Sequence, residues 1–304
     1  MYDVIIVGGS YAGLAAALQL GRARRRVLIV DAGQRRNRFA ASSHGFLGQD
    51  GQSPAAIVAK GRSEVLAYPT VSWRDAAVSD VRATAQGFAV RAADDELHGQ
   101  RLILATGVVD ELPAIPGLRE RWGQSVFHCP YCHGYELEMG RIGVLATSSL
   151  AMHSASLVSE WAGRGETTLF LNGAFEPDPE QLAELTSRDI QLEREPVVGA
   201  EGAAPGIGLR LRDGRARQLE GLFVLPRTQV NDHLAKQLGC ELQAGPTGSF
   251  YKTEPFKETT VPGVFACGDV ALPAGAVSLA VGDGVLAGIG AHRSLVFPQA
   301  RSHP

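Results

Sequence analysis

The first part of the chain alternates between apolar runs of strand length and a helical pattern. Tyr2 to Val7 is one apolar run, and Val27 to Val30 is another that ends at Asp31. Between them, Leu14 to Arg22 has the composition of a helix. Short, continuously apolar strands are typical of parallel sheets that are covered on both faces, so this segment predicts a βαβ unit.

A capped helix and a set of short strands are predicted next. Ser53 to Ala67 has the pattern of a helix, with Ser53 as its cap and Pro54 at its first position. From Val71 to Leu104 we expect three short strands, and the last of them runs from Arg101 to Ala105. The Pro-rich link from Leu112 to Gly117 then predicts a domain boundary.

The chain repeats the βαβ pattern before it returns to the first unit. The strand, helix and strand of the second unit are expected at Arg141–Ala146, Ala151–Trp161 and Thr167–Leu171. Ile207 to Leu225 predicts a hairpin and a return strand, and Ala276 to Leu295 is the expected closing helix. This alternation predicts an α/β protein with parallel sheets.

The composition is that of a soluble globular protein of about two domains. The 304 residues are 45% apolar and 20% charged, and the net charge of −3 gives no positive excess that would attract nucleic acid or an anionic membrane. No apolar run reaches the roughly 18 residues of a membrane span. Because no basic segment followed by a long apolar one opens the sequence, we expect no secretory signal and a cytoplasmic protein.

A glycine turn links the first predicted strand to its helix. Gly8 and Gly13 occupy the outer positions of a G-x-G-x-x-G pattern, and Ser10 stands at the middle one. Such a turn lets the backbone approach a pyrophosphate, and the helix N-terminus supplies N–H groups with a partial positive charge. Asp31 follows the next strand, where a carboxylate can accept hydrogen bonds from a ribose. The pattern predicts a dinucleotide site, and a generic α/β turn is the alternative.

A C-x-x-C motif, Cys129 and Cys132, lies within HCPYCHGYE at residues 128–136. In a chain without a secretory signal this spacing indicates redox chemistry or metal binding. A helix N-terminus or an imidazolium beside the motif would stabilise the thiolate, which is the species that attacks a disulfide. Zinc is the alternative, but it needs a second pair of ligands at suitable spacing. Cys240 and Cys267 have no such partners and are expected to be ordinary buried cysteines.

Four sequence blocks occur in a characteristic order: GGSYAG at 8–13, ATG at 105–107, the C-x-x-C, and VFACGDV at 264–270. In these blocks the chain resembles the thioredoxin-reductase-like flavoproteins over nearly its whole length. The resemblance implies two Rossmann-like, three-layer nucleotide-binding domains, the second inserted in the first, as in low-molecular-weight thioredoxin reductases. Residues 1–113 and 227–304 would form the discontinuous FAD-binding domain, and residues 114–226 the inserted NAD(P)H-like domain that carries the C-x-x-C.

The same resemblance assigns roles to individual residues. Asp269 would reach the ribityl or phosphate region of FAD, Cys132 would face the flavin, and Cys129 would exchange with the substrate. The implied FAD-binding residues are Gly8, Gly9, Ser10, Ala12, Gly13, Asp31, Ala32, Asn37, Thr106, Gly107, Gly268, Asp269 and Ala276.

The nicotinamide site that the resemblance implies is degenerate in this sequence. The family's second glycine motif aligns with ATSSLA at residues 146–151, which contains no glycine. The family also places arginines after the next strand to neutralise the 2′-phosphate of NADPH. Here no Lys or Arg occurs from Gly165 to Ser187, whereas five acidic residues do. The alternative, that NADPH binds with basic residues from elsewhere in the fold, stays open.

A narrower resemblance follows from the C-x-x-C and from these absences. In combining the motif CPYCHGYE with a lost nicotinamide site, the chain resembles the gliotoxin- and holomycin-type dithiol oxidases. That resemblance implies that FAD passes electrons from a small dithiol to oxygen without NADPH. His133 replaces the family's acidic proton donor and is the candidate acid/base, with His128 as the second choice, because imidazole titrates near neutrality. A structural histidine is the alternative for each.

Two further functions remain alternatives. A disulfide reductase would run the chemistry in the opposite direction on a thioredoxin-like protein, with NADPH or another donor such as a ferredoxin. A non-catalytic flavoprotein redox sensor would keep the fold without turnover. The expected partner is a small-molecule dithiol or a thioredoxin-like protein. We expect neither nucleic acid, membrane nor metal as a ligand, and a homodimer only by family resemblance.

Overall fold

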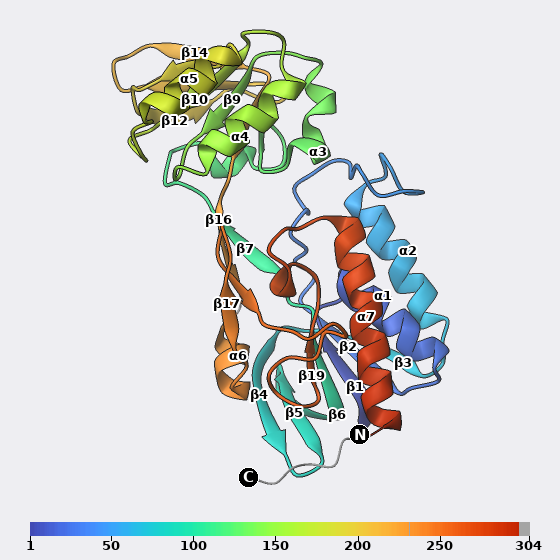
Figure 1. The fold of residues 1–304 in the computed structure, drawn as a ribbon. Coiled ribbons are helices and arrows are strands. Elements are labelled where there is room, and N and C mark those ends of the chain that lie inside the picture. The colour runs from blue at the N-terminus through green and yellow to red at the C-terminus, as the bar shows by residue number, and fades with distance from the viewer. Residues whose placement is uncertain (231, 298–304) are drawn as a thin grey trace.

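The computed structural model describes residues 1–230 and 232–297 and has two lobes joined by a narrow neck (Figure 1). The predicted C-terminal segment 227–304 includes Asn231 and residues 298–304, which lie outside the described residues. None of the helices in the described part of the chain is both long and apolar enough to cross a membrane.

The larger lobe is built on a seven-stranded sheet. Strands β3, β2, β1, β6 and β19 are mutually parallel, whereas β4 and β5 continue from β6 in antiparallel pairs. The strands are β1 (Tyr2–Val7), β2 (Val27–Asp31), β3 (Val71–Asp75), β4 (Val78–Thr84), β5 (Gly87–Ala92), β6 (Asp95–Leu104) and β19 (Val264–Ala266).

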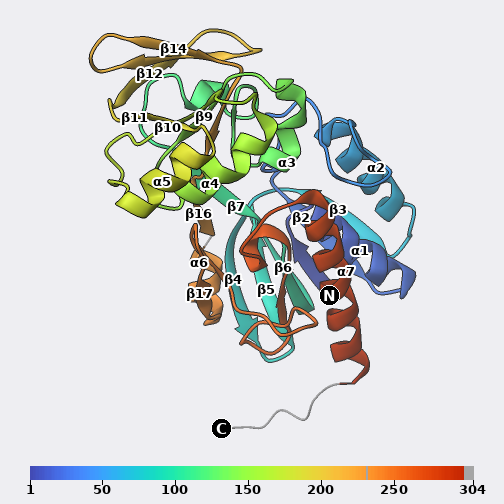
Figure 2. The same cartoon turned by 45° about the horizontal axis from the view of Figure 1, so that its top comes forward.

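Both faces of this sheet are covered, which explains its continuously apolar strands. In β1, Val4 and Ile6 pack into a core with the helices, while Ile5 and Val7 pack into a second core on the opposite face. The helices α1 (Tyr11–Arg22), α2 (Pro54–Leu66) and α7 (Val277–Val296) lie together on the first face (Figures 1 and 2).

The prediction of three strands between Val71 and Leu104 is wrong, because the structure has four there. The break between β3 and β4 falls at Ala76–Ala77, where no Gly, Pro or Asn marks a turn. The expected start of the last strand at Arg101 is also wrong, since β6 begins at Asp95 directly after the hairpin. Its residues 95–98 pair only with β5 and are mostly polar, which hid them from the apolar pattern.

The smaller lobe has three layers around a five-stranded parallel sheet ordered β11-β10-β9-β15-β8. Helices cover one face, and a three-stranded antiparallel sheet covers the other. The strands are β8 (Val126–Phe127), β9 (Ile142–Leu145), β10 (Thr167–Phe170), β11 (Gln191–Glu193) and β15 (Gly221–Val224), with β12 (Val197–Glu201), β13 (Ile207–Leu211) and β14 (Ala216–Leu219) in the second sheet. The helices are α3 (Pro130–His133), α4 (Ala151–Val158) and α5 (Pro179–Ser187).

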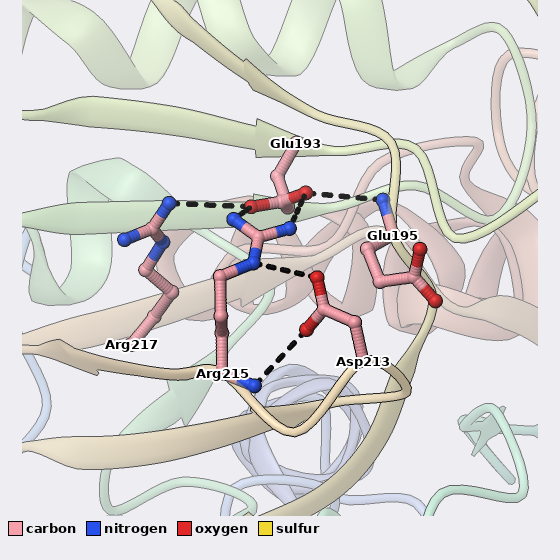
Figure 3. A network of polar contacts seen from close by, with 5 residues as sticks. All are labelled: Glu193, Glu195, Asp213, Arg215 and Arg217. Carbon is pink, nitrogen blue, oxygen red and sulfur yellow. Dashed lines mark hydrogen bonds and ion pairs between the residues drawn. The ribbon is translucent and has the colours of Figure 1, made fainter.

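A charged network ties the end of β11 to the β13–β14 hairpin (Figure 3). The buried carboxylate of Glu193 accepts both terminal nitrogens of Arg215 at 2.8 and 3.0 Å and Nη2 of Arg217 at 3.3 Å. Nε of Arg215 also donates to Asp213 at 2.6 Å. Both arginines are therefore already paired with carboxylates.

The neck is the antiparallel pair β7 (Val108–Glu111) and β16 (Arg227–Val230) (Figure 1). After β16 the chain adds α6 (Asp232–Leu238), β17 (Leu242–Ala244) and β18 (Ser249–Tyr251) to the larger lobe before β19 joins its sheet. The α/β architecture predicted from the sequence is confirmed.

Candidate active site

The glycine turn between β1 and α1 is packed backbone against backbone. Gly8 has a left-handed φ of +103°, and a Cβ there would overlap the carbonyl oxygen of Ala105. A Cβ on Gly13 would overlap the carbonyl oxygen of Gly8. Ser10 caps α1 without a side-chain hydrogen bond into the helix. The turn thus brings a helix N-terminus to the end of β1 in the arrangement that binds a pyrophosphate.

The acidic residue after β2 points back to this turn. Asp31 accepts the backbone N–H of Gly9 at 3.0 Å through Oδ1, and its carboxylate retains acceptor capacity for a ribose. Ala32 follows it on the surface. Asn37 donates its side-chain amide to the hydroxyl of Tyr11 at 3.0 Å, so the loop after β2 is tied to the first turn of α1.

The C-terminal segment meets the N-terminal turn at the same place. A Cβ on Gly268 would lie 2.9 Å from the Cβ of Ala12, so the turn after β19 touches the start of α1. At the end of β6, the buried Oγ1 of Thr106 has no hydrogen-bond partner among the described residues. Gly107 beside it has a left-handed φ of +64°, and a Cβ there would find nothing within 4 Å. These open donors and spaces fit the phosphate and sugar of a bound dinucleotide.

Arg36 is a site residue that the sequence reading missed. Its guanidinium donates to Asp269 at 2.8 Å and, in bidentate geometry, to Asp110 at 2.6 and 2.8 Å. Asp110 lies on β7 in the neck, so Arg36 connects the expected flavin-binding turn with the link between the lobes. Gly275, next to Ala276 at the N-cap of α7, packs against the same two side chains, Arg36 and Asp269.

The redox motif stands at the start of a one-turn helix. Cys129 and Cys132 form a disulfide with a Cα–Cα distance of 5.4 Å, and Cys129 is the N-cap of α3. When this bond is reduced, the position at a helix N-terminus favours the thiolate of Cys129. Cys240 and Cys267, in contrast, are free and buried, and burial raises the pKa of both thiols.

Two histidines flank the motif in different surroundings. The ring of His133 stacks on Phe127 at 4.3 Å, and its buried Nδ1 has no hydrogen-bond partner among the described residues. Burial lowers the pKa of His133. Burial, followed by the charge of Arg36, lowers the pKa of His128 to about 4. Both rings are therefore neutral near pH 7, and a neutral imidazole can accept a thiol proton.

The loop after β2 also reaches the lobe that carries the cysteines. Nε2 of His44 lies 3.5 Å from the carboxylate of Glu136, just beyond α3. A Cβ on Gly123 would lie 2.9 Å from the Cβ of Phe39. Within the described residues, no three His, Cys, Asp or Glu side chains are grouped as metal ligands.

Two buried charges in the larger lobe were missed along with Arg36. Asp283 and Lys257 form a buried ion pair behind the turn after β19. Nothing in the sequence distinguished Arg36 from the other arginines of its loop. A signal for Asp283 did exist, because it is the only acidic residue of the small and apolar helix α7.

Comparison with known proteins gives the family. The chain matches the pyridine nucleotide-disulphide oxidoreductase family over residues 2–285. The thioredoxin reductase sirT of Leptosphaeria maculans is 34% identical over 95% of this chain and 93% of its own. The thioredoxin reductase aclD of Aspergillus oryzae is 34% identical over 98% of each chain.

Solved structures agree with this relationship. An oxidoreductase from Agrobacterium tumefaciens has a TM-score of 0.94 and 52% identity, over 98% of this chain and 99% of that one. HlmI has a TM-score of 0.90 and 37% identity, over 97% of this chain and 92% of its own. Proteins of this kind are FAD flavoproteins, and the glycine turn, Asp31 and the open atoms at Thr106 and Gly107 fit that cofactor. The chain therefore belongs to the pyridine nucleotide-disulphide oxidoreductase family and is a thioredoxin-reductase-like, FAD-dependent disulfide oxidoreductase.

Proposed function

We propose that this enzyme oxidises a small-molecule dithiol to a disulfide, with oxygen as the final acceptor and without NADPH. The single observation that carries the proposal is the turn between β9 and α4, where the family's nicotinamide cofactor would bind.

Side chains of that turn make hydrogen bonds within it and to the residue that follows β15. Thr147 donates its hydroxyl to the carbonyl of Leu225 at 2.8 Å, and Ser148 Oγ accepts the N–H of Leu150 at 3.4 Å. A dinucleotide turn needs glycines so that its backbone can approach the pyrophosphate. Because none is present between Ala146 and Ala151, this turn offers side chains in place of bare backbone.

The charges around the next strand add a second argument. The loop after β10 carries Glu176 and Asp178 and no cation, and Asp178 is committed to capping α5. Arg194 extends from the end of β11 toward this loop, but it is paired with Glu176. Arg215 and Arg217 are paired with Glu193 (Figure 3). A 2′-phosphate would have to displace carboxylates from these arginines.

The chain's own residues suffice for the thiol exchange. One thiolate of the substrate attacks the Cys129–Cys132 bond at Cys129, and Cys132 leaves as a thiolate. The second substrate thiol gives its proton to the neutral imidazole of His133, attacks the mixed disulfide, and displaces Cys129. The substrate has then lost two electrons, and the cysteine pair has gained them. FAD held by the glycine turn and Asp31 would supply the two-electron acceptor for the reduced cysteine pair, with oxygen as the final oxidant and hydrogen peroxide as its product.

The surface beside the cysteines is aromatic. Tyr131, between the two cysteines, is 70% exposed and packs edge-on against Trp161 with ring centroids 5.1 Å apart. Tyr135, after the motif, is 86% exposed. Exposed tyrosines next to a reactive disulfide provide a contact surface for a small organic substrate.

The test is an anaerobic mixing experiment with the yellow holoenzyme. Excess NADPH or NADH should leave the visible flavin band unchanged, whereas dithiothreitol as the dithiol probe should bleach it. Admission of air should restore the band and produce hydrogen peroxide equimolar with the disulfide. Rapid bleaching by NADPH, with no peroxide formed on turnover, would overturn the proposal.

A reductase is the second candidate, because the relatives sirT and aclD are both named thioredoxin reductases. In that case NADPH or another donor would bleach the flavin, and a thioredoxin-like protein would reoxidise it. Cys132→Ser should abolish turnover in either direction while FAD stays bound. The matched control is Cys240→Ser, which changes a free and buried cysteine and should keep turnover. Dithiol oxidation at the wild-type rate by the Cys132→Ser enzyme would contradict any role for the disulfide.

A further inference from the structure

A carboxylate inside helix α7 holds the turn that follows β19. Asp283 is 7% exposed, and its Oδ2 accepts the backbone N–H of Gly268 at 2.8 Å. Its other oxygen, Oδ1, lies 2.9 Å from Nζ of Lys257, which is also 7% exposed. Each oxygen of this buried carboxylate therefore has one strong partner.

The hydrogen bond falls at the point where the chain leaves the sheet. Gly268 has a left-handed φ of +77°, and the next residue is Asp269, the expected flavin-binding acid that Arg36 also contacts. By accepting the Gly268 N–H, Asp283 fixes the orientation of the peptide between Cys267 and Gly268. The direction in which Asp269 leaves the turn follows from that orientation.

Lys257 is itself tied to the same strand. It has a left-handed φ of +67°, which is uncommon for lysine, and its carbonyl accepts the N–H of Ala266 in β19 at 3.0 Å. Its N–H donates to the carbonyl of Glu254 at 2.8 Å. The lysine backbone is thus anchored on both sides, and its ammonium meets Asp283 across the core.

We propose that Asp283 is a positioning residue for the flavin cofactor: it orients the Gly268–Asp269 turn, and Lys257 compensates its buried charge. The inference rests on FAD as the cofactor and on no particular substrate or electron acceptor. It can therefore fail while the dithiol oxidase proposal stands, and the reverse also holds.

The decisive comparison uses two double variants that remove both buried charges. Lys257→Met/Asp283→Asn keeps an amide oxygen that can accept the Gly268 N–H, whereas Lys257→Met/Asp283→Leu has a side chain of similar size without an acceptor. We expect the Asn variant to bind FAD within about 3-fold of the wild type and the Leu variant to bind at least about 10-fold more weakly. The dissociation constant is measured by the change in flavin fluorescence when FAD is added to the full chain freed of cofactor.

A second readout separates positioning from simple stability. The urea midpoint of the cofactor-free chain should be somewhat lower in the Leu double variant, which leaves the buried Gly268 N–H without an acceptor, but both double variants should be fully folded at zero urea, where FAD binding is measured. Single Asp283→Leu should be much less stable, since it leaves the ammonium of Lys257 buried without a partner. The control is Asp189→Asn, which breaks an exposed ion pair with Arg164 in the other lobe and should change neither readout.

Two results would overturn the inference. Equal FAD affinity in the two double variants would show that the acceptor at position 283 is irrelevant to the cofactor. A loss of affinity in the Leu variant that is accounted for by a fraction of unfolded chain at zero urea would show a structural role alone. If the Leu variant does not fold, Lys257→Met/Asp283→Ser replaces it. The serine hydroxyl is one atom shorter than the carboxylate and should not reach the Gly268 N–H, so FAD should bind more weakly. Wild-type affinity in this variant would equally contradict the stated geometry.

Discussion

Protonation of His128 should destabilise the fold in a definite pH window. This half-buried ring precedes the redox cysteine, and burial followed by the charge of Arg36 lowers its pKa from 6.5 to about 4. The unfolded chain therefore binds more protons than the folded one between these two values, and stability falls as the pH falls through them. The full shift corresponds to about 3 kcal/mol, and because the residue is only partly buried we expect about 2 kcal/mol to be lost.

The assay is urea denaturation at about pH 7 and about pH 4 on the cofactor-free chain, so that FAD release adds no pH dependence of its own. Wild type should lose about 2 kcal/mol more than His128→Asn between the two conditions. His153→Asn, which changes an exposed histidine on α4, should behave as wild type does. An imidazole NMR signal of His128 that titrates near its ordinary pKa, or equal losses in wild type and His128→Asn, would refute the reasoning.

Three other predictions follow from the geometry. Gly13→Val places a side chain on the Gly8 carbonyl, an overpacking of about 1–3 kcal/mol, so the flavin content of the purified protein should fall; a fully yellow variant would contradict the tight turn. His133→Asn should lower dithiol turnover about 100-fold with flavin still bound. Because burial lowers the pKa of His133, the rate of the wild-type enzyme should fall only at pH values below the ordinary histidine pKa of 6.5. If the variant shows the same pH–rate profile as the wild type, His133 is not the base. Glu193→Gln should lower the urea midpoint at neutral pH but not in acid. Burial alone would raise the pKa of Glu193, but the hydrogen bonds and charge of Arg215 outweigh it and lower the pKa, and protonation in acid removes these ion pairs from the wild type as well. A lower midpoint of the variant that persists in acid would contradict this account.

The elements that depend on local pattern were predictable, and those that depend on long-range pairing were not. The helix after Ser53 begins where its cap and proline place it, and Ser53 Oγ accepts the N–H of Ala56 at 3.1 Å. Helix α1 instead begins at Tyr11, three residues before the predicted start, because the small residues of the glycine turn are already helical. The short strand β11 was not predicted at all, since its pairing with β10 compensates for a weak local signal.

The candidate site divides in the same way. Residues next to a motif, such as Asp31 after its strand, could be found from spacing because one βαβ unit brings them together. Arg36 could not, because its partners Asp110 and Asp269 lie on the neck and on the far C-terminal segment. A single sequence carries no information about which loop arginine meets a carboxylate 233 positions away.

Two ion networks, one partly buried and one buried, converge on the turn after β19. Arg36 holds the carboxylate of Asp269 from one side, and Asp283 with Lys257 holds the N–H of Gly268 from the other. Buried ion pairs contribute little net stability, because desolvation offsets most of their attraction. Their value here is geometric: a turn whose peptide and side chain are both fixed before the cofactor arrives loses less conformational freedom on binding. The larger lobe should therefore hold its cofactor-binding shape in the absence of FAD, which explains why the charges of Asp283 and Lys257 lie in its core.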